Sequence, residues 1–384
     1  MVLLCKSRKR NNFMKIGLFS PFIAENIGGG ERYFLTVAEC MLNDGHEVDL
    51  ILQSDFHQDS LSRDDLKQKY IKAFNLNLKD LKIINGPFGR GSSLWQRFKF
   101  SREYDVFYYM TDGSFFVPGA KRNVAHFMIP FKKPRGNLFN QLKLKFWPVK
   151  TANSYFTKGI IEKNWGIRIN YVHWGAVNRD DFKPGEKGKI ILNVGRFFSA
   201  SGGKHCKRQD ILVSAFRQMC DQGLKDWQLV LNGPIDKGED NVAYAQKVAN
   251  MVRGYPITIR HEGNFKTLQN DYAKASIYWH ATGYDLDENE YPEAMEHLGM
   301  STVEAMAAGT VPVVINKAGQ KEIVTDKENG LLWETKDELI NKTEEVMKNK
   351  ELWQKLSQNA QKRAEDFSKV KFCHMTKEMF GLAL

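Results

Sequence analysis

The sequence predicts an α/β protein of two doubly wound domains, each built on a parallel sheet. Its 384 residues are more than one hydrophobic core usually organises, which favours two domains. Near the start, a short apolar run leads through a glycine cluster into a helical stretch and then a second apolar run. The second half repeats this alternation, and strands alternating with helices are typical of parallel sheets. Such sheets bind ligands beyond the carboxyl ends of their strands.

The first half begins with an expected strand at residues 14–19, a loop at Gly28, Gly29 and Gly30, and a helix over residues 31–43. Further elements are expected as strands at 48–52, 106–109 and 123–127 and as a helix at 153–164. Residues 1–13 are predicted to be a flexible tail, and residues 14–184 the first domain.

The second half begins after Phe182-Lys-Pro-Gly185, which breaks the alternation and places the domain boundary at about residue 184. Its expected strands are residues 189–194, 228–231, 257–260, 277–280 and 311–315. Its expected helices are residues 207–222, 240–253, 267–274 and 300–308. A last helical stretch runs from about Lys336 to the end with a break near Phe367. Residues 185–360 are predicted to form the second domain, and residues 361–384 a helix that crosses back to the first.

Composition excludes several classes of protein. With 42% hydrophobic and 26% charged residues, the chain is neither collagen-like nor disordered. No uncharged apolar run approaches the roughly 18 residues of a membrane span, and the N-terminus does not have the order of a secretory signal. The five cysteines are odd in number and contain no Cys-x-x-Cys, which indicates a reducing cytoplasm rather than a disulfide or zinc framework.

The net charge of +11 belongs to the first half. Residues 1–200 hold 32 Lys and Arg against 18 Asp and Glu, a net of +14, and residues 201–384 hold 24 against 27, a net of −3. A basic half indicates a polyanionic partner, either nucleic acid or an anionic membrane surface.

The strongest chemical motif is a pair of glutamates, Glu296 and Glu304, separated by seven residues. Gly299 directly precedes a helix that is expected to start at Met300 or Ser301, so Glu296 lies in the loop. A helix N-terminus offers free N–H groups to an anion such as a diphosphate, and flanking carboxylates can accept hydrogen bonds from sugar hydroxyls. The alternative is a surface glutamate and a helix-capping carboxylate.

Read with other motifs, this segment resembles the retaining nucleotide-sugar glycosyltransferases of family 4, which have the GT-B fold of two Rossmann-like domains facing a central crevice. The resemblance covers nearly the whole chain after Met14. It rests on the motifs Gly28-Gly-Gly-Glu31, Ala125-His-Phe127, Val194-Gly-Arg-Phe197, Lys207-Arg-Gln-Asp210, the two spaced glutamates, Val311-Pro-Val-Val314 and Gly319-Gln-Lys-Glu-Ile323.

The resemblance implies a role for each matching residue. Arg196 and Lys207 would contact the donor diphosphate, with Lys204 as a rival for the role of Lys207 because a polar loop separates the two motifs. Glu296 would bind sugar hydroxyls and Glu304 the ribose. The remaining expected donor contacts are the loop Gly28, Gly29 and Gly30, the donor-sugar contact His126, and the backbone N–H groups of Leu298, Gly299 and Met300. Base contacts are expected at Gly263, Asn264 and Phe265.

In this family the acceptor attacks the face from which the diphosphate leaves, and the leaving phosphate can take the acceptor proton. No dedicated nucleophile and no metal or other cofactor is then expected. Asp285-Leu-Asp287 has the spacing of a metal-binding Asp-x-Asp, but a solvated acidic loop is the favoured interpretation.

A basic and aromatic segment spans residues 131–150, with six basic residues and no acidic one. Its residues Lys132, Lys133, Lys143, Lys145 and Trp147 are predicted to contact an anionic membrane. A solvated helix packed on the sheet is the alternative, and the mixture could also stack on single-stranded nucleic acid.

The sequence therefore predicts a cytoplasmic glycosyltransferase on the inner membrane face. It would move a hexose from a nucleotide diphosphate sugar to a saccharide or polyprenyl-linked acceptor in cell-surface glycan synthesis. The alternatives are another GT-B enzyme, such as a nucleotide-sugar epimerase or a disaccharide synthase, and a nucleic-acid-binding protein. No zinc-finger, helix-turn-helix or RNP motif supports the last.

Overall fold

The computed structural model describes residues 13–23, 28–54, 62–89, 91–134, 138–199, 205–261 and 264–382. The strands of the first sheet are β1 (Lys15–Phe19), β2 (Glu47–Leu52), β3 (Lys82–Asn85), β4 (Val106–Met110), β5 (Arg122–Phe127), β6 (Val149–Ala152) and β7 (Tyr171–Val172). The helices among them are α1 (Gly29–Asn43), α2 (Arg63–Phe74), α3 (Leu94–Ser101), α4 (Leu138–Lys143) and α5 (Tyr155–Trp165), with a 3-10 turn at Leu144–Phe146.

The second sheet follows in the chain. Its strands are β8 (Ile190–Val194), β9 (Gln228–Asn232), β10 (Ile257–Arg260), β11 (Ile277–His280), β12 (Val311–Ile315) and β13 (Leu331–Trp333). Its helices are α6 (Gln209–Asp221), α7 (Glu239–Met251), α8 (Phe265–Lys274), α9 (Met300–Ala307), α10 (Gln320–Ile323), α11 (Lys336–Lys348), α12 (Lys350–Ala364) and α13 (Lys369–Phe380).

In both sheets the strand order reverses at one internal strand pair. This reversal confirms the predicted doubly wound fold class. The strand orders are β3-β2-β1-β4-β5-β6-β7 and β10-β9-β8-β11-β12-β13. The pairs β1–β4 and β8–β11 are parallel and join strands that are not consecutive in the chain. In doubly wound sheets such a pair marks the place where ligands bind, outside the carboxyl ends of the strands.

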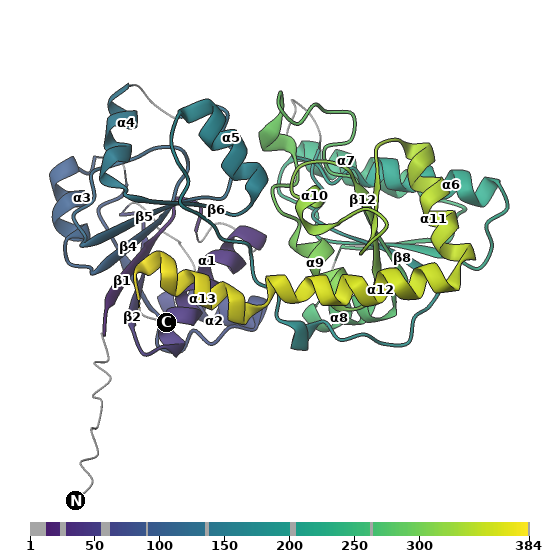
Figure 1. The fold of residues 1–384 in the computed structure, drawn as a ribbon, viewed down its shortest axis with the longest axis horizontal. Coiled ribbons are helices and arrows are strands. Elements are labelled where there is room, and N and C mark those ends of the chain that lie inside the picture. Colours follow the sequence, from purple (N-terminus) through teal and green to yellow (C-terminus); the bar gives the residue numbers. More distant parts are fainter. Residues whose placement is uncertain are drawn as a thin grey trace, which may run out of the picture. The chain divides into compact units, whose positions relative to one another are not determined.

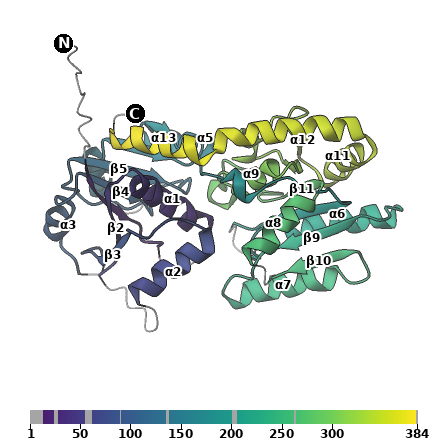
Figure 2. The ribbon, with the colours of Figure 1, turned by 90° about the horizontal axis from the view of Figure 1, so that it is seen from below.

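Alternate residues of the second sheet pack into two separate hydrophobic clusters. The ribbons in Figures 1 and 2 show the helices that flank this sheet. On one face, Trp279 of β11 packs with apolar side chains of α6, α7 and α11. On the other, Tyr278 packs with those of α8, α9 and α12. The apolar runs of these strands are continuous because both faces are covered.

Packing contacts divide the chain into two compact units. The first comprises Met1–His126, Arg135–Lys150 and Cys373–Leu384, and the second comprises Phe127–Pro134 and Thr151–Phe372. The first sheet ends with β7 and the second begins with β8, so the sheets change between residues 172 and 190. The sequence-based boundary at residue 184 stays a prediction, since sheet membership and packing contacts divide the chain at different places.

Several element boundaries differ from those expected. Helix α1 begins at Gly29 rather than Glu31, so two of the three glycines belong to its first turn. The helical stretch after Lys336 has an additional break at Asn349, whose side chain accepts a hydrogen bond from the Leu352 N–H and caps α12. The strands β3, β6, β7 and β13, of two to four residues each, were not expected, although the four-residue strands β10 and β11 were. The predicted tail lies almost wholly outside the described residues.

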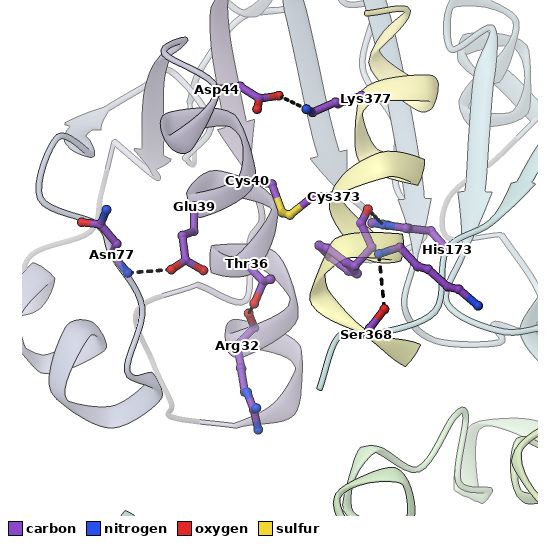
Figure 3. The surroundings of a disulfide bond; sticks show 12 residues. Arg32, Thr36, Glu39, Cys40, Asp44, Asn77, His173, Ser368, Cys373 and Lys377 are labelled. Carbon is purple, nitrogen blue, oxygen red and sulfur yellow. Dashed lines mark hydrogen bonds and ion pairs between the residues drawn. A yellow bond between two sulfur atoms is a disulfide. The ribbon is translucent and has the colours of Figure 1, made fainter. Parts of the chain in front are cut away.

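The expectation that the cysteines form no disulfide is wrong. Cys40 of α1 and Cys373 of α13 form a disulfide with their Cα atoms 5.3 Å apart (Figure 3). One helical turn further along both helices, Lys377 Nζ pairs with Asp44 Oδ2 at 2.6 Å. The two cysteines are 333 residues apart in sequence, so their spacing carries no sign of the pairing. The disulfide fastens the C-terminal segment to α1.

The predicted membrane contact of Trp147 is also wrong. Its side chain is completely buried in the first unit, where Nε1 donates a hydrogen bond to the Phe116 carbonyl at 2.9 Å. Its ring lies 5.3 Å from that of Tyr109. The presence of aromatic residues near basic ones in a sequence does not show which aromatic side chains are buried in the core.

We expect the disulfide to be detectable by thiol titration. Denatured protein should expose two more reactive thiols after reduction than before it. The double variant Cys40→Ser/Cys373→Ser should lose about 2–4 kcal/mol of unfolding free energy, because the cross-link restricts the unfolded chain. The variant Cys220→Ser removes a free cysteine and serves as the control. An unchanged thiol count after reduction would contradict the pairing.

Candidate functional site

The candidate site lies at the carboxyl ends of β8 and β11, the strand pair where the second sheet reverses its order. The residues after β8 are Gly195 and Arg196, and the last residue of β11 is His280. The loop from Met295 to Gly299 leads into α9, which begins at Met300 as the sequence predicts. The topology therefore brings three chain segments to one edge of this sheet.

Glu296 and Lys207 form an ion pair at this edge. The Lys207 ammonium donates to Oε2 of Glu296, and each side chain is only 14% exposed. The same oxygen lies 2.9 Å from Nε2 of His280, which is completely buried. Glu296 is thus neither a surface residue nor a lone carboxylate, and two of the predicted site residues are in direct contact.

The electrostatics keep Glu296 ionised. Burial alone raises the pKa of a carboxyl, but the Lys207 ammonium and the His280 hydrogen bond outweigh it and hold the pKa of Glu296 well below 4.5. Burial lowers the pKa of His280, more than the adjacent carboxylate raises it. Burial and then Lys207 lower the pKa of His205 to about 3. At neutral pH the cluster holds one cation, one anion and neutral imidazoles, so Glu296 can accept hydrogen bonds but has no proton to give.

Glycines make room for this arrangement. A Cβ on Gly195 would lie 2.7 Å from Cγ of Lys207, so the lysine stem needs a glycine there. Gly299 has φ +105°, and a Cβ on it would lie 2.1 Å from Nε2 of Gln320. A Cβ on Gly319 would lie 2.5 Å from the His297 carbonyl oxygen. Contacts this short show that the loop carrying Glu296 packs tightly against the Gly319–Gln320 turn.

The N-terminus of α9 presents the backbone donors that the sequence predicted. The N–H groups of Leu298, Gly299 and Met300 have no acceptor within the part of the chain that the structure describes. The side chain of Leu298 is buried in the core, so its contribution to a ligand would come from its backbone. Free N–H groups at a helix start form an anion-binding arrangement.

Glu304 lies one turn into α9 and is buried, with only 6% exposed. Its Oε2 accepts a hydrogen bond from the Tyr272 hydroxyl at 2.9 Å. Tyr272 therefore fixes the orientation of this carboxylate. The predicted spacing places Glu296 before the helix and Glu304 inside it.

Arg196 lies on the loop after β8 and is one-third exposed. Its guanidinium is 3.6 Å from Asp236 and 4.5 Å from the centre of the Phe198 ring. A pair of this length is loose, so the arginine can exchange partners at small cost. Lys204, the predicted rival for the role of Lys207, lies outside the described residues.

The predicted donor residues of the first unit lie in β5 and at the start of α1. His126 is the penultimate residue of β5 and is completely buried, with its ring stacked 4.7 Å from that of Tyr33. Gly28 is the N-cap of α1, and a Cβ on Gly29 or Gly30 would meet no atom of the described residues within 4 Å. These two glycines thus leave open space at the start of α1.

The predicted base-binding segment has structural contacts. The Asn264 side chain accepts from the Thr267 N–H at 2.9 Å and caps α8, and the Phe265 ring packs edge-on against Phe182. Gly263 lies outside the described residues. The prediction of base contacts here stays untested.

No group of three or more His, Cys, Asp or Glu in the described ranges has a metal-binding arrangement. In the Asp285–Glu290 loop, Asp287 accepts from the N–H groups of Asn289 and Glu290, and Glu288 pairs with Lys321. Within the same ranges, no helix is long and apolar enough to span a bilayer.

Sequence analysis missed His280, Tyr272 and Gln320. The one available signal was the position of His280 at the end of an expected strand, next to the switch in strand order. That signal needs the strand order, which only the folded sheet supplies. Tyr272 and Gln320 act through contacts across 32 and 18 residues and give no local pattern.

The fold is that of a GT-B type of protein, and the edge site of its second sheet combines an ion pair with backbone N–H groups that are free within the described part of the chain. Residues 176–363 match the family model of the glycosyl transferases group 1. A segment of 78 residues is 36% identical to a GDP-Man:Man(3)GlcNAc(2)-PP-Dol alpha-1,2-mannosyltransferase of Dictyostelium discoideum. That match covers 20% of this chain and 15% of the relative.

Solved structures share the fold over almost the whole chain. HepE of Anabaena in complex with UDP superposes with a TM-score of 0.73 at 17% identity, covering 96% of this chain and 100% of that one. A glycosyltransferase from Rickettsia africae gives a TM-score of 0.71 at 17% identity, covering 96% and 99%. At these identities the likeness shows the fold, and the family match supports a glycosyltransferase.

We expect the stability contribution of Glu296 to depend on pH in one direction. Its folded-state pKa lies below the unfolded value of 4.5, so the ionised form adds stability that is complete above about pH 5 and is lost progressively as the pH falls from 4.5 through the lower folded-state pKa. Glu296→Gln should therefore cost about 1–3 kcal/mol of unfolding free energy at pH 7, and progressively less below pH 4.5.

Chemical denaturation between pH 3.5 and 8 measures this difference. Glu365→Gln breaks an exposed pair with Arg179 and should change stability by less than about 1 kcal/mol. A cost of Glu296→Gln that stays constant with pH would contradict the assigned ionisation.

Proposed function

We propose that the protein is a retaining hexosyltransferase that uses a nucleotide diphosphate sugar. The acceptor is a saccharide or a lipid-linked saccharide, and the product serves cell-surface glycan synthesis. The observation that carries the proposal is the Lys207–Glu296–His280 cluster beside the start of α9, at the switch point of the second sheet.

The donor diphosphate would bind where cations and backbone donors meet. An ammonium has three donors, and Lys207 uses one for Glu296, which leaves two for phosphate oxygens. Arg196 can leave its loose pair with Asp236 for the same purpose, and the N–H groups at the start of α9 add neutral donors. Together they would stabilise the charge that develops on the leaving diphosphate.

The two glutamates would hold the sugar rings. Glu296 is an ionised acceptor and suits a hydroxyl of the transferred hexose. Glu304, oriented by Tyr272, suits the ribose hydroxyls. An acceptor-only Glu296 supports a reaction in which the leaving phosphate, not a protein carboxyl, takes the acceptor proton. His126 and the glycines at the start of α1 are further proposed donor contacts, and Asn264 and Phe265 would lie near the base.

The ligands and substrates of similar proteins narrow the choice of donors to be tried. HepE of Anabaena has been crystallised with UDP and with UDP-glucose, and the Dictyostelium relative is described as using GDP-mannose. UDP-hexoses and GDP-mannose are therefore the first candidates. No metal or other cofactor is proposed, because Lys207 and Arg196 would supply the positive charge.

The first domain would face the acceptor and an anionic membrane at the inner face of the cytoplasmic membrane. Of the segment proposed for this contact, Trp147 is excluded by burial, and Lys132 donates a hydrogen bond to the Glu290 carbonyl. A smaller basic and apolar surface remains, with Leu142 and Phe146 about half exposed beside Lys143 and Lys145. This mixture suits an interface with anionic lipid better than it suits nucleic acid, since a glycosyltransferase can act on lipid-linked acceptors.

Donor binding and transfer can be tested together. We expect one nucleotide sugar of a panel to raise the melting temperature and to support transfer to a saccharide or polyprenyl-diphosphate acceptor. Arg196→Ala and Glu296→Gln should each lower kcat/KM by about 100-fold or more, because each removes charge stabilisation or a sugar contact.

Arg179→Ala is the matched control, since it removes an arginine from an exposed ion pair in the same unit. Full transfer by either site variant would refute the assignment of the site. Retention of anomeric configuration is read from the product by NMR, and an inverted product would refute the proposed mechanism.

Liposome flotation tests the membrane contact. Vesicles with anionic lipid should float the protein, and Leu142→Ser/Phe146→Ser and Lys143→Gln/Lys145→Gln should each reduce the bound fraction several-fold, because apolar burial and charge both contribute. The control Lys350→Gln/Lys355→Gln neutralises two exposed lysines of the other packing unit and should float normally. Binding that survives both pairs of changes at residues 142–146 would exclude this surface.

A further inference from the structure

His280 has contacts that the proposed function does not yet use. Its Nε2 lies 2.9 Å from Oε2 of Glu296 and 3.1 Å from the Thr282 hydroxyl oxygen. An ionised carboxylate can only accept hydrogen bonds. Nε2 must therefore carry the imidazole proton and donate it to Glu296.

The other ring nitrogen confirms this tautomer. Nδ1 of His280 is buried and has no hydrogen-bond partner in the described part of the chain. A proton there would be a buried donor without an acceptor, which is costly. The ring is therefore neutral, in agreement with its lowered pKa.

His280 and Lys207 both bind the same oxygen of Glu296. Oε2 takes both hydrogen bonds, and Oε1 has no partner among the described residues. The side chain is 14% exposed, and its unpaired Oε1 is not fully buried. One oxygen is thus fixed by the protein and the other is open to a ligand.

We propose that His280 is a positioning residue, which fixes the carboxylate plane of Glu296 so that Oε1 faces a hydroxyl group of the donor sugar. This inference rests on the proposed function. Lys207 alone could not fix the plane, since an ammonium on a four-carbon stem is a rotatable donor, whereas a buried imidazole has a set direction.

A second buried histidine provides a control that separates positioning of Glu296 from a purely structural role. His173 is also almost fully buried, and its Nε2 contacts the backbone carbonyl of Phe372 at 3.1 Å. Its ring also lies 4.0 Å from that of Phe372, so its observed contacts are with the C-terminal segment. His173→Gln is therefore a matched control for the loss of a buried imidazole.

Substitutions at His280 separate positioning from packing. His280→Gln keeps an N–H donor near the place of Nε2, His280→Asn carries its donor too close to the backbone, and His280→Leu has none. We expect the Asn and Leu variants to lose about 10- to 100-fold in kcat, with a donor KM within about threefold of the unchanged protein. The Gln variant should recover most of the rate, and His173→Gln should keep it.

Thermal shifts give a second measure. In His280→Leu the stabilisation by UDP or GDP alone should be unchanged, and the additional stabilisation by the corresponding nucleotide sugar should fall. Equal kcat for the Gln, Asn and Leu variants, or equal loss in all three, would overturn the inference.

A measurement without donor keeps the two proposals distinguishable. In protein labelled with ¹⁵N-histidine, the signals of His280, assigned by their loss in His280→Gln, should show the Nε2–H tautomer at pH 7, and Glu296→Gln should shift them. An Nδ1–H tautomer, or His280 signals that Glu296→Gln does not shift, would refute the positioning role even in an active enzyme. A protein with the expected signals but no donor binding or transfer would refute the proposed function and retain the His280–Glu296 contact.

Discussion

The site depends on one carboxylate kept ionised away from water. Glu296 is mostly buried, and burying a charge without a partner costs several kcal/mol. The Lys207 ammonium compensates the charge, and the His280 N–H supplies a directed hydrogen bond. Because both bind the same oxygen, the ion pair does not consume the carboxylate, and the second oxygen stays available for chemistry.

That arrangement constrains the surrounding backbone. The Lys207 stem passes where a Cβ of residue 195 would be, and the Glu296 loop rests on Gly319. Gly299 takes a positive φ that lets the chain turn directly from the loop into α9. The glycines of these motifs are therefore explained by close approach and turning, and each supports the position of a charged side chain or of the helix N-terminus.

The packing of the second unit fixes the strands that carry these residues. β8 and β11 are central in their sheet, and their alternate side chains are buried in two helical layers. Buried strands hold the residues at their ends rigidly in place, which suits groups that must contact a ligand in a set geometry. In the first unit the disulfide between α1 and α13 has a comparable effect, since it fixes the C-terminal segment on the helix that starts at the glycine cluster.

The sequence by itself determined the fold class, most central strands, the start of α9 and the pair of glutamates around it. These follow from local patterns, namely apolar runs of four to six residues, glycine at a turn, and spacing along one helix. Only the tertiary structure decided that Lys207 meets Glu296 across 89 residues, that His280 joins them, and that Cys40 meets Cys373. It also decided that Trp147 belongs to the core and not to a surface. Contacts between distant segments depend on strand order and on which face each side chain takes, and a single sequence shows neither, because short edge strands and long-range pairs leave no periodic signal.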